Sequence, residues 1–212
     1  MRTLAPFERG MAVLLAALAG YIDSLGFLQL GGLFVSFMSG NSTRMAVGVS
    51  MGDWRTVGVA AAILGLFVLG AALGALVAGG EGMRSRSRVL TLEAALLAVA
   101  ALAVSMGLTP LAVGLMVLAM GIENAVFLRD GEVGVGLTYM TGALVKLGQA
   151  LAGALRGGHR TAFAPYLLLW VGLFGGAVVG AFSYGALGLS ALWPAAALAA
   201  GLAVFARVSP EA

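Results

Sequence analysis

The chain has 212 residues, of which 61% are hydrophobic and only 10% charged, and its mean hydropathy is +1.04. This composition excludes a water-soluble globular domain and indicates an integral membrane protein. The apolar runs are continuous and about twenty residues long, as needed for a helix that crosses a hydrocarbon core of roughly 30 Å, whereas barrel strands alternate over about ten residues. The sequence therefore predicts an all-α, polytopic membrane helix bundle that forms one domain over residues 1–212.

Several classes of function are also disfavoured by composition. The chain has no cysteine, which excludes disulfides and thiolate sites. Its one histidine, His159, lies in a polar RGGHR stretch and cannot build a two-histidine metal site. No zinc-protease, nucleophile-elbow or phosphate-loop motif is present, so we predict no enzyme activity, no metal and no cofactor. The net charge of +3 comes from arginines scattered between apolar runs, which is not the pattern of a nucleic-acid-binding face.

Six apolar runs are predicted to cross the membrane. In chain order they are 11–30, 56–78, 89–105, 111–128, 162–183 and 187–206. The first follows a short basic stretch like a signal peptide, but Tyr21 and Asp23 replace a cleavage site, so we interpret it as a permanent helix.

Two weaker segments, 31–49 and 133–155, decide the topology. Each carries a small polar break followed by a cation, FMSGNSTR in one and YMTGALVK in the other. If both crossed the bilayer, the arginines of residues 84–88 would lie opposite the N-terminus, against the positive-inside rule. Six crossings with two re-entrant or broken segments instead place both termini and most arginines on one side. We therefore expect a multi-pass protein of the bacterial inner membrane with cytoplasmic N- and C-termini.

The two halves of the chain resemble each other, which predicts one repeat over residues 10–107 and a second over 108–207. The matches are Gly20 with Gly121, Asp23 with Glu123 or Asn124, Met38-Ser39-Gly40 with Met140-Thr141-Gly142, and Arg44 with Lys146. Each half would hold three crossings and one broken segment, and an odd number of crossings forces opposite orientations. Inverted-topology repeats with broken helices are typical of transporters and some channels.

Glycines spaced for close helix packing also recur in both halves. They form the pairs Gly70/Gly74 and Gly176/Gly180, each within a similar GLF-containing stretch. Gly-xxx-Gly spacing lets helices approach closely, either inside one bundle or between two copies. We expect internal packing, with a homodimer through these faces as the alternative.

The chain resembles a known family through AGYIDSLGFLQLGGLFVSFMSGNSTRMAVGV (19–49), MGIENAVF (120–127) and YMTGALVKLG (139–148). These stretches and the six-span length are similar to the YoaK family, small bacterial inner-membrane proteins catalogued as a domain of unknown function. That family's first break reads Met-Thr-Gly-Asn, so Ser39 departs by one methyl group. The resemblance implies the fold and the location, and no substrate or catalytic residue.

Polar residues inside the apolar segments are the candidates for function, because a charge at mid-bilayer costs roughly 2.5–3.5 kcal/mol on insertion scales. A substrate-binding set is predicted at the two breaks: Ser39, Gly40, Asn41, Arg44, Thr141, Gly142 and Lys146. A second set is predicted to couple protons or form ion pairs: Asp23, Glu93, Glu123 and Asn124. Two structural alternatives stay open. Asp23 pairs with Arg44 or Lys146 in one, and in the other Glu93 extends to the cytoplasmic interface.

The resulting hypothesis is a small-solute transporter or channel whose site lies where the two broken segments cross. Helix N-termini and a nearby cation favour an anionic or carboxylate-bearing solute, unless the cations neutralise the carboxylates. One repeat would rock against the other to alternate access. The partners would then be the solute and membrane lipids. The alternative is a non-transporting membrane scaffold or assembly protein with a paired polar core.

Overall fold

The computed structural model describes residues 6–80, 82–129, 132–134 and 136–209. Its elements in chain order are α1 (Pro6–Gln29), α2 (Met38–Met51), α3 (Trp54–Ala78), α4 (Met83–Ser105), α5 (Thr109–Glu123), β1 (Leu128–Arg129), β2 (Glu132–Val133), α6 (Met140–Leu155), α7 (Ala164–Leu187), the 3-10 helix η1 (Gly188–Ala191) and α8 (Leu192–Val208). The predicted helical bundle is therefore confirmed. The short antiparallel β1–β2 hairpin was not predicted.

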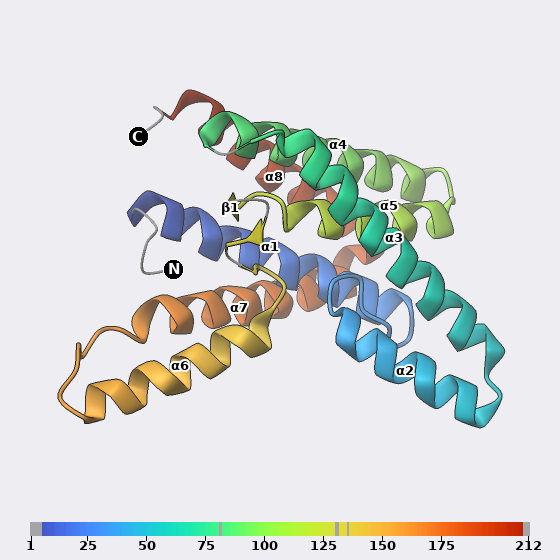
Figure 1. The fold of residues 1–212 in the computed structure, drawn as a ribbon. Coiled ribbons are helices and arrows are strands. Elements are labelled where there is room, and N and C mark those ends of the chain that lie inside the picture. The colour runs from blue at the N-terminus through green and yellow to red at the C-terminus, as the bar shows by residue number, and fades with distance from the viewer. Residues whose placement is uncertain (1–5, 81, 130–131, 135, 210–212) are drawn as a thin grey trace.

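The helices pair across the two halves of the chain (Figure 1). The long helix α1 packs on α7, and α5 packs on α3, so each half supplies one helix to a pair with the other half. Helix α4 lies between α8 and α5, while α2 packs on α3 and α6 packs on α7. In Figure 1 the α2 and α6 ends point to opposite sides of the bundle.

The α1–α7 contact is close because glycine removes side chains from it. A Cβ atom built on Gly176 of α7 would overlap the backbone of Ala17, and one built on Gly20 of α1 would overlap the backbone of Leu173. Gly180 lies against Tyr21 in the same way. The two backbones therefore meet directly, which maximises dispersion contacts in a medium where burial of apolar groups gives no driving force.

The α3–α5 contact repeats this arrangement with the corresponding residues. Gly70 of α3 lies against the backbone of Leu118, and Gly121 of α5 lies against the backbone of Phe67. Gly74 lies against Ile122, one turn further on. The expectation that the Gly-xxx-Gly pairs pack inside the bundle is confirmed. These glycines contact helices of the same chain.

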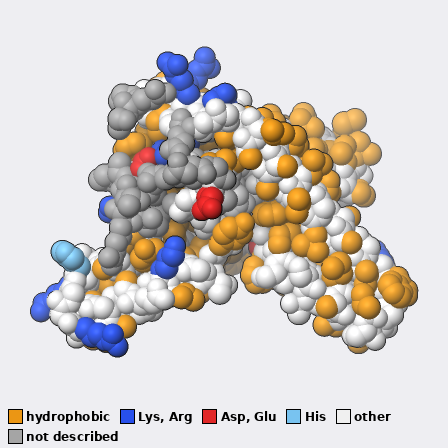
Figure 2. All heavy atoms as spheres, viewed as in Figure 1, with side chains coloured by type: hydrophobic (Ala, Val, Ile, Leu, Met, Phe, Trp, Pro, Cys, Tyr) orange, Lys and Arg blue, Asp and Glu red, His pale blue; other side chains and the backbone are white. Residues whose placement is uncertain are grey.

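Helix lengths match a membrane protein. Helices α1, α3 and α4 and the joined α7–α8 stretch (Ala164–Val208, 45 residues) are long and apolar enough to cross a membrane, whereas α5 and α6 are shorter apolar helices. Large apolar side chains on outward faces are exposed, such as Leu76 (78%) and Phe182 (79%). Figure 2 shows hydrophobic side chains over much of the arm formed by α2 and α3. Lipid tails are the natural partners of such surfaces.

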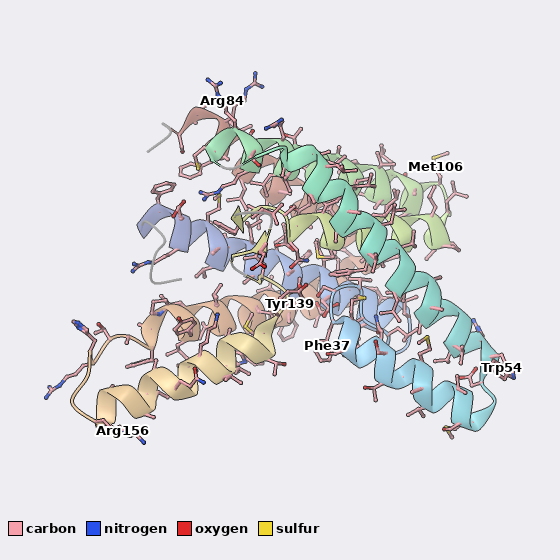
Figure 3. The ribbon with its side chains drawn as sticks, viewed as in Figure 1. Phe37, Trp54, Arg84, Met106, Tyr139 and Arg156 are labelled. Carbon is pink, nitrogen blue, oxygen red and sulfur yellow. The ribbon has the colours of Figure 1, made fainter. Side chains whose placement is uncertain are left out.

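Most arginine-bearing helix ends lie at one end of the molecule, and the start of α3 with Arg55 is the exception. Figure 3 places Arg84 and Arg156 at one end and Trp54 and Met106 at the other. The first helix begins, and α8 ends, at the arginine end. The terminal residues themselves, 1–5 and 210–212, lie outside the described residues, as does position 81 of the arginine-rich loop.

Three predicted boundaries differ from the structure. The fourth predicted crossing, 111–128, is helical only to Glu123, so α5 rises about 22 Å. The breaks also lie earlier than predicted. Ser39, Gly40 and Thr141 belong to the first turns of α2 and α6, and the described non-helical backbone precedes them at 30–37 and at 124–129, 132–134 and 136–139. Gly31 and Gly32 take positive φ angles of 64° and 110°, which glycine adopts without strain.

Replacing Gly176 by alanine is expected to lower the free energy of unfolding by about 1–3 kcal/mol, because the added methyl group overpacks the α1–α7 contact. Thermal melting of the purified protein in detergent, followed by tryptophan fluorescence, measures the change. The control is Gly175→Ala, whose methyl group would meet no atom within 4 Å. Equal melting temperatures for the two variants would contradict this account of the glycine contact.

Candidate functional site

The candidate site is the pair of helix N-termini at which α2 and α6 begin. Each helix follows a non-helical segment, and the residues that cap them, Phe37 and Tyr139, lie toward the middle of the molecule in Figure 3. The far ends of the same two hairpins, near Trp54 and Arg156, lie at opposite ends. Both helices therefore run outward from the interior in opposing directions.

Asp23 of α1 holds the first non-helical segment in place. Its Oδ1 atom accepts hydrogen bonds from the backbone N–H groups of Val35 and Ser36, both at 2.8 Å. Backbone N–H groups without a partner cost several kcal/mol in hydrocarbon, so a carboxylate that accepts two of them stabilises the loop. The predicted ion pair of Asp23 with Arg44 or Lys146 is not formed. The carboxylate is satisfied by backbone instead.

Asn124, the residue that matches Asp23 in the second half, holds the second segment. Its Oδ1 accepts a hydrogen bond from the Thr138 hydroxyl at 3.0 Å, and its Nδ2 donates to the carbonyl of Met120 at 3.0 Å. In both halves, then, a polar residue within or directly after the first helix bonds the segment before the short helix. Asn124 is buried and its bonds are internal.

Ser36 and Thr138 are site residues that the sequence analysis missed. Both are buried, and each is followed by an aromatic residue, a methionine, a hydroxyl residue and a glycine. The full match is Ser36-Phe37-Met38-Ser39-Gly40 with Thr138-Tyr139-Met140-Thr141-Gly142. Extending the three-residue match by two positions toward the N-terminus would have identified Ser36 and Thr138.

Asn41 has a structural role rather than the predicted solute contact. Its side-chain amide pairs with the backbone of Phe34 in both directions, donating through Nδ2 to the carbonyl at 2.7 Å and accepting from the N–H at 2.9 Å. The side chain is fully buried. At the corresponding place in α6 stands Ala143, so only the first loop is closed in this way.

The exposed residues of the two first turns are Ser39, Thr141 and Gly142, while Gly40 is partly covered by the Phe37 ring. Phe37 and Tyr139 occupy the N-cap positions, and neither side chain forms a capping hydrogen bond. N–H groups at a helix start that lack such a cap are available to a bound anion or polar solute.

Arg44 and Lys146 occupy the same place in the two short helices. Each is the seventh residue of its helix, nearly two turns from the start rather than one, and each is exposed. The guanidinium of Arg44 lies 5.9 Å from the centroid of the Phe27 ring and against the Gly32 backbone. Among the described residues, neither cation forms an ion pair with Asp23, Glu93 or Glu123.

The remaining predicted residues, Glu93 and Glu123, lie elsewhere. Glu93 is near the middle of α4 and Glu123 is the last residue of α5. Both side chains are fully buried, so the alternative in which Glu93 extends to the cytoplasmic interface is wrong. Helices α4 and α5 pack together and bring these two carboxyl groups near each other, a pairing that the sequence analysis did not predict.

Open cavities lined by described residues flank the bundle away from the starts of α2 and α6. One of 1060 Å³ lies at the arginine end of α4, lined by Arg84, Arg88 and Arg207 with apolar and hydroxyl side chains. A second, of 670 Å³, lies between the starts of α1 and α7 beside Arg9. An apolar cavity of 310 Å³ lies between α1, α7 and α8. In the part of the chain that is described, no three metal-ligating side chains come together.

Comparison with known proteins gives a consistent result. A family model described as "Protein of unknown function (DUF1275)" matches residues 11–205. The UPF0700 transmembrane protein RA0705 of Rhizobium meliloti (strain 1021) is 37% identical over 187 residues, which cover 87% of this chain and 80% of that protein. The UPF0700 transmembrane protein YoaK of Bacillus subtilis (strain 168) is 30% identical over 160 residues, covering 72% and 71%.

No solved structure matches this chain. The family model covers most of the sequence, and the two relatives confirm the resemblance to YoaK that the broken segments suggested. This chain is therefore a transmembrane protein that belongs to the DUF1275 family of proteins of unknown function.

Proposed function

We propose that the protein is a small-solute transporter or channel of the bacterial inner membrane, with its solute site at the starts of α2 and α6. The observation that carries the proposal is the pair of uncapped short helices. Each starts inside the molecule, exposes a hydroxyl residue in its first turn, and carries an exposed cation at its seventh position. Helix N-termini and cations both attract negative charge, which favours an anionic or carboxylate-bearing solute.

The proposal includes a topology of six crossings and two re-entrant segments, in two inverted repeats over 10–107 and 108–207. Its support is the equivalence of α1–α7 with α5–α3 and of the Asp23 loop with the Asn124 loop. The arginine end carries Arg84 and Arg156 and so corresponds to the cytoplasmic side, where the positive-inside rule places such residues and where both termini would lie. The loop before α2 then enters from outside and the loop before α6 from inside.

Transport in this scheme occurs when one half rocks against the other. The α1–α7 and α3–α5 contacts both lie between the two halves, so this movement must take place at these contacts. The exposed hydroxyl groups of Ser39 and Thr141 contact the solute, and Arg44 and Lys146 set its charge. Asp23 and Asn124 keep the two loops ordered while access alternates.

One observation favours the alternative of a non-transporting scaffold. The buried polar groups at the loops satisfy one another, since Asn41 bonds Phe34, Asp23 bonds Ser36, and Asn124 bonds Thr138. A scaffold needs its buried polar groups to be hydrogen-bonded inside the protein, and it needs no aqueous path. The two readings differ in whether water reaches the first turns of α2 and α6.

Removal of both cations tests the solute site. A proteoliposome flux screen covers anionic, cationic, zwitterionic and neutral solutes. Arg44→Ala/Lys146→Ala is expected to slow flux of an anionic solute by about tenfold or more, because the loss of even one contact to a charged group has an effect of that size. The control is Arg156→Ala/Arg160→Ala, which removes two equally exposed cations from a loop. If wild type and the Arg44/Lys146 variant behave alike for every solute class, the site assignment is wrong.

Cysteine labelling tests both the topology and the water path, because the native chain has no cysteine. In right-side-out and inverted vesicles, Ser39→Cys is expected to react with a membrane-impermeant maleimide from outside and Thr141→Cys from inside. Ala16→Cys, at a fully buried position of α1, is the unreactive control. Failure of both test positions to react supports the scaffold, and reaction of both from one side contradicts the inverted arrangement.

A further inference from the structure

Two carboxyl groups in the interior have no role in the solute site. Glu93 of α4 and Glu123 of α5 lie close enough to interact electrostatically, on helices from the two halves of the chain that run side by side. Each is fully buried at 0% exposure. They come from different halves, so movement of one half against the other would change their surroundings.

The four oxygen atoms of these two side chains are the only buried side-chain nitrogen or oxygen atoms without a hydrogen-bond partner among the described residues. Other buried polar groups nearby are satisfied. The Ser87 hydroxyl donates to the Ala203 carbonyl at 3.0 Å, and the Thr138 hydroxyl donates to Asn124. Two unpartnered carboxyl groups therefore stand out against a well-bonded interior.

Within the described part of the chain, neither carboxyl group forms an ion pair with a cation. The elements packed on α4 and α5 are α1, α3, α8 and η1. The ionisable side chains elsewhere on these elements are Glu8, Arg9, Tyr21, Asp23, Arg55, Arg84, Arg86, Arg88 and Arg207. Of these, Arg86 already pairs with Glu8 at 2.7 Å, and Arg88 donates to the Ala78 carbonyl.

An ionised carboxylate in an apolar interior, without donors or a cation, is strongly disfavoured, and two adjacent ones repel each other as well. The chemical species that relieves this cost without needing a large cavity is the proton. Each uptake joins one proton from the aqueous phase to one carboxylate oxygen and forms a neutral carboxylic acid, with no other bond made or broken. Buried acidic residues in membrane proteins commonly mark proton paths for this reason.

We propose that Glu93 and Glu123 form a proton-binding site, occupied by protons in the arrangement seen here. If the protein is the transporter proposed above, this site supplies the coupling ion. Glu123 ends α5 and is followed directly by Asn124, which holds the loop before α6. Loss of a proton at Glu123 therefore acts on the anchor of the second half of the solute site.

The proton-binding step is tested by infrared spectroscopy of the purified full chain near neutral pH, since the carboxylic acid C=O band is distinct from that of carboxylate. Wild type is expected to show this band, Glu93→Gln and Glu123→Gln each to lose about half of it, and the double variant to lose all of that contribution. Glutamine has nearly the same shape, so the folded state is retained. Glu132→Gln, at an exposed residue of β2, is the control and is expected to keep the band.

The wild-type protein alone provides a second measurement that needs no variant to fold. Raising the pH is expected to remove the band and, in deuterated water, the band is expected to shift slowly because the groups are buried. A wild-type band no larger than that of the double glutamine variant would overturn the proposal.

A separate measurement tests coupling. Proteoliposomes adsorbed on a solid support are given a pH step, with protons as the only probe. Wild type and Glu132→Gln are expected to produce a transient charge displacement that the double glutamine variant lacks. If the infrared band is present but the wild type moves no charge, the protons are static and the coupling role is wrong, whereas the flux and labelling experiments still decide the solute site.

Discussion

The structure depends on one constraint of the bilayer, namely that backbone polar groups away from water must find partners inside the protein. The α-helices meet it along their length through their own backbone hydrogen bonds. The described residues of the two segments before α2 and α6, 30–37 and 124–129, 132–134 and 136–139, do not, because their backbone is not helical. Asp23 and Asn41 bond backbone groups of the first segment, whereas Asn124 holds the second segment through the side chain of Thr138. The scarce polar residues of the chain are concentrated where the helical pattern stops.

Side-chain bonding also explains why loop geometry and helix packing are linked. Asp23 lies three residues after Gly20, and Asn124 lies three residues after Gly121, so each loop anchor stands beside a close backbone contact. The α1–α7 contact fixes the position of Asp23, and Asp23 in turn fixes where α2 starts. Tyr21 adds a hydrogen bond from its hydroxyl to the carbonyl of Ala191 at 2.9 Å, tying α1 to the turn between α7 and α8.

The class of fold, the packing use of the glycines and the matching places of Arg44 and Lys146 could be predicted from sequence, because each depends on composition or on spacing along one helix. The residues at which α2 and α6 start could not be predicted from sequence. Ser39-Gly40 looks like a break because both residues are small and polar, but the partner that defines the loop is Asp23, whose bonds go to backbone N–H groups that leave no mark in a side-chain pattern. The meeting of Glu93 with Glu123 was missed because hydropathy reports how apolar a helix is and not which neighbour each side of it meets.

The α1–α7 contact has a consequence for how the chain is made. The glycine face of α1 contacts a helix that begins at Ala164, and the hydroxyl of Tyr184 reaches back to Gln29 at 2.9 Å. Most of the chain must be synthesised and inserted before this partner exists. During that time the backbone of α1 at Gly20 has no helix packed on it. The backbone of α3 at Gly70 is in the same state until α5 is made. The helix bundle is therefore completed late in synthesis, since contacts between residues far apart in sequence form only after the intervening chain is in place.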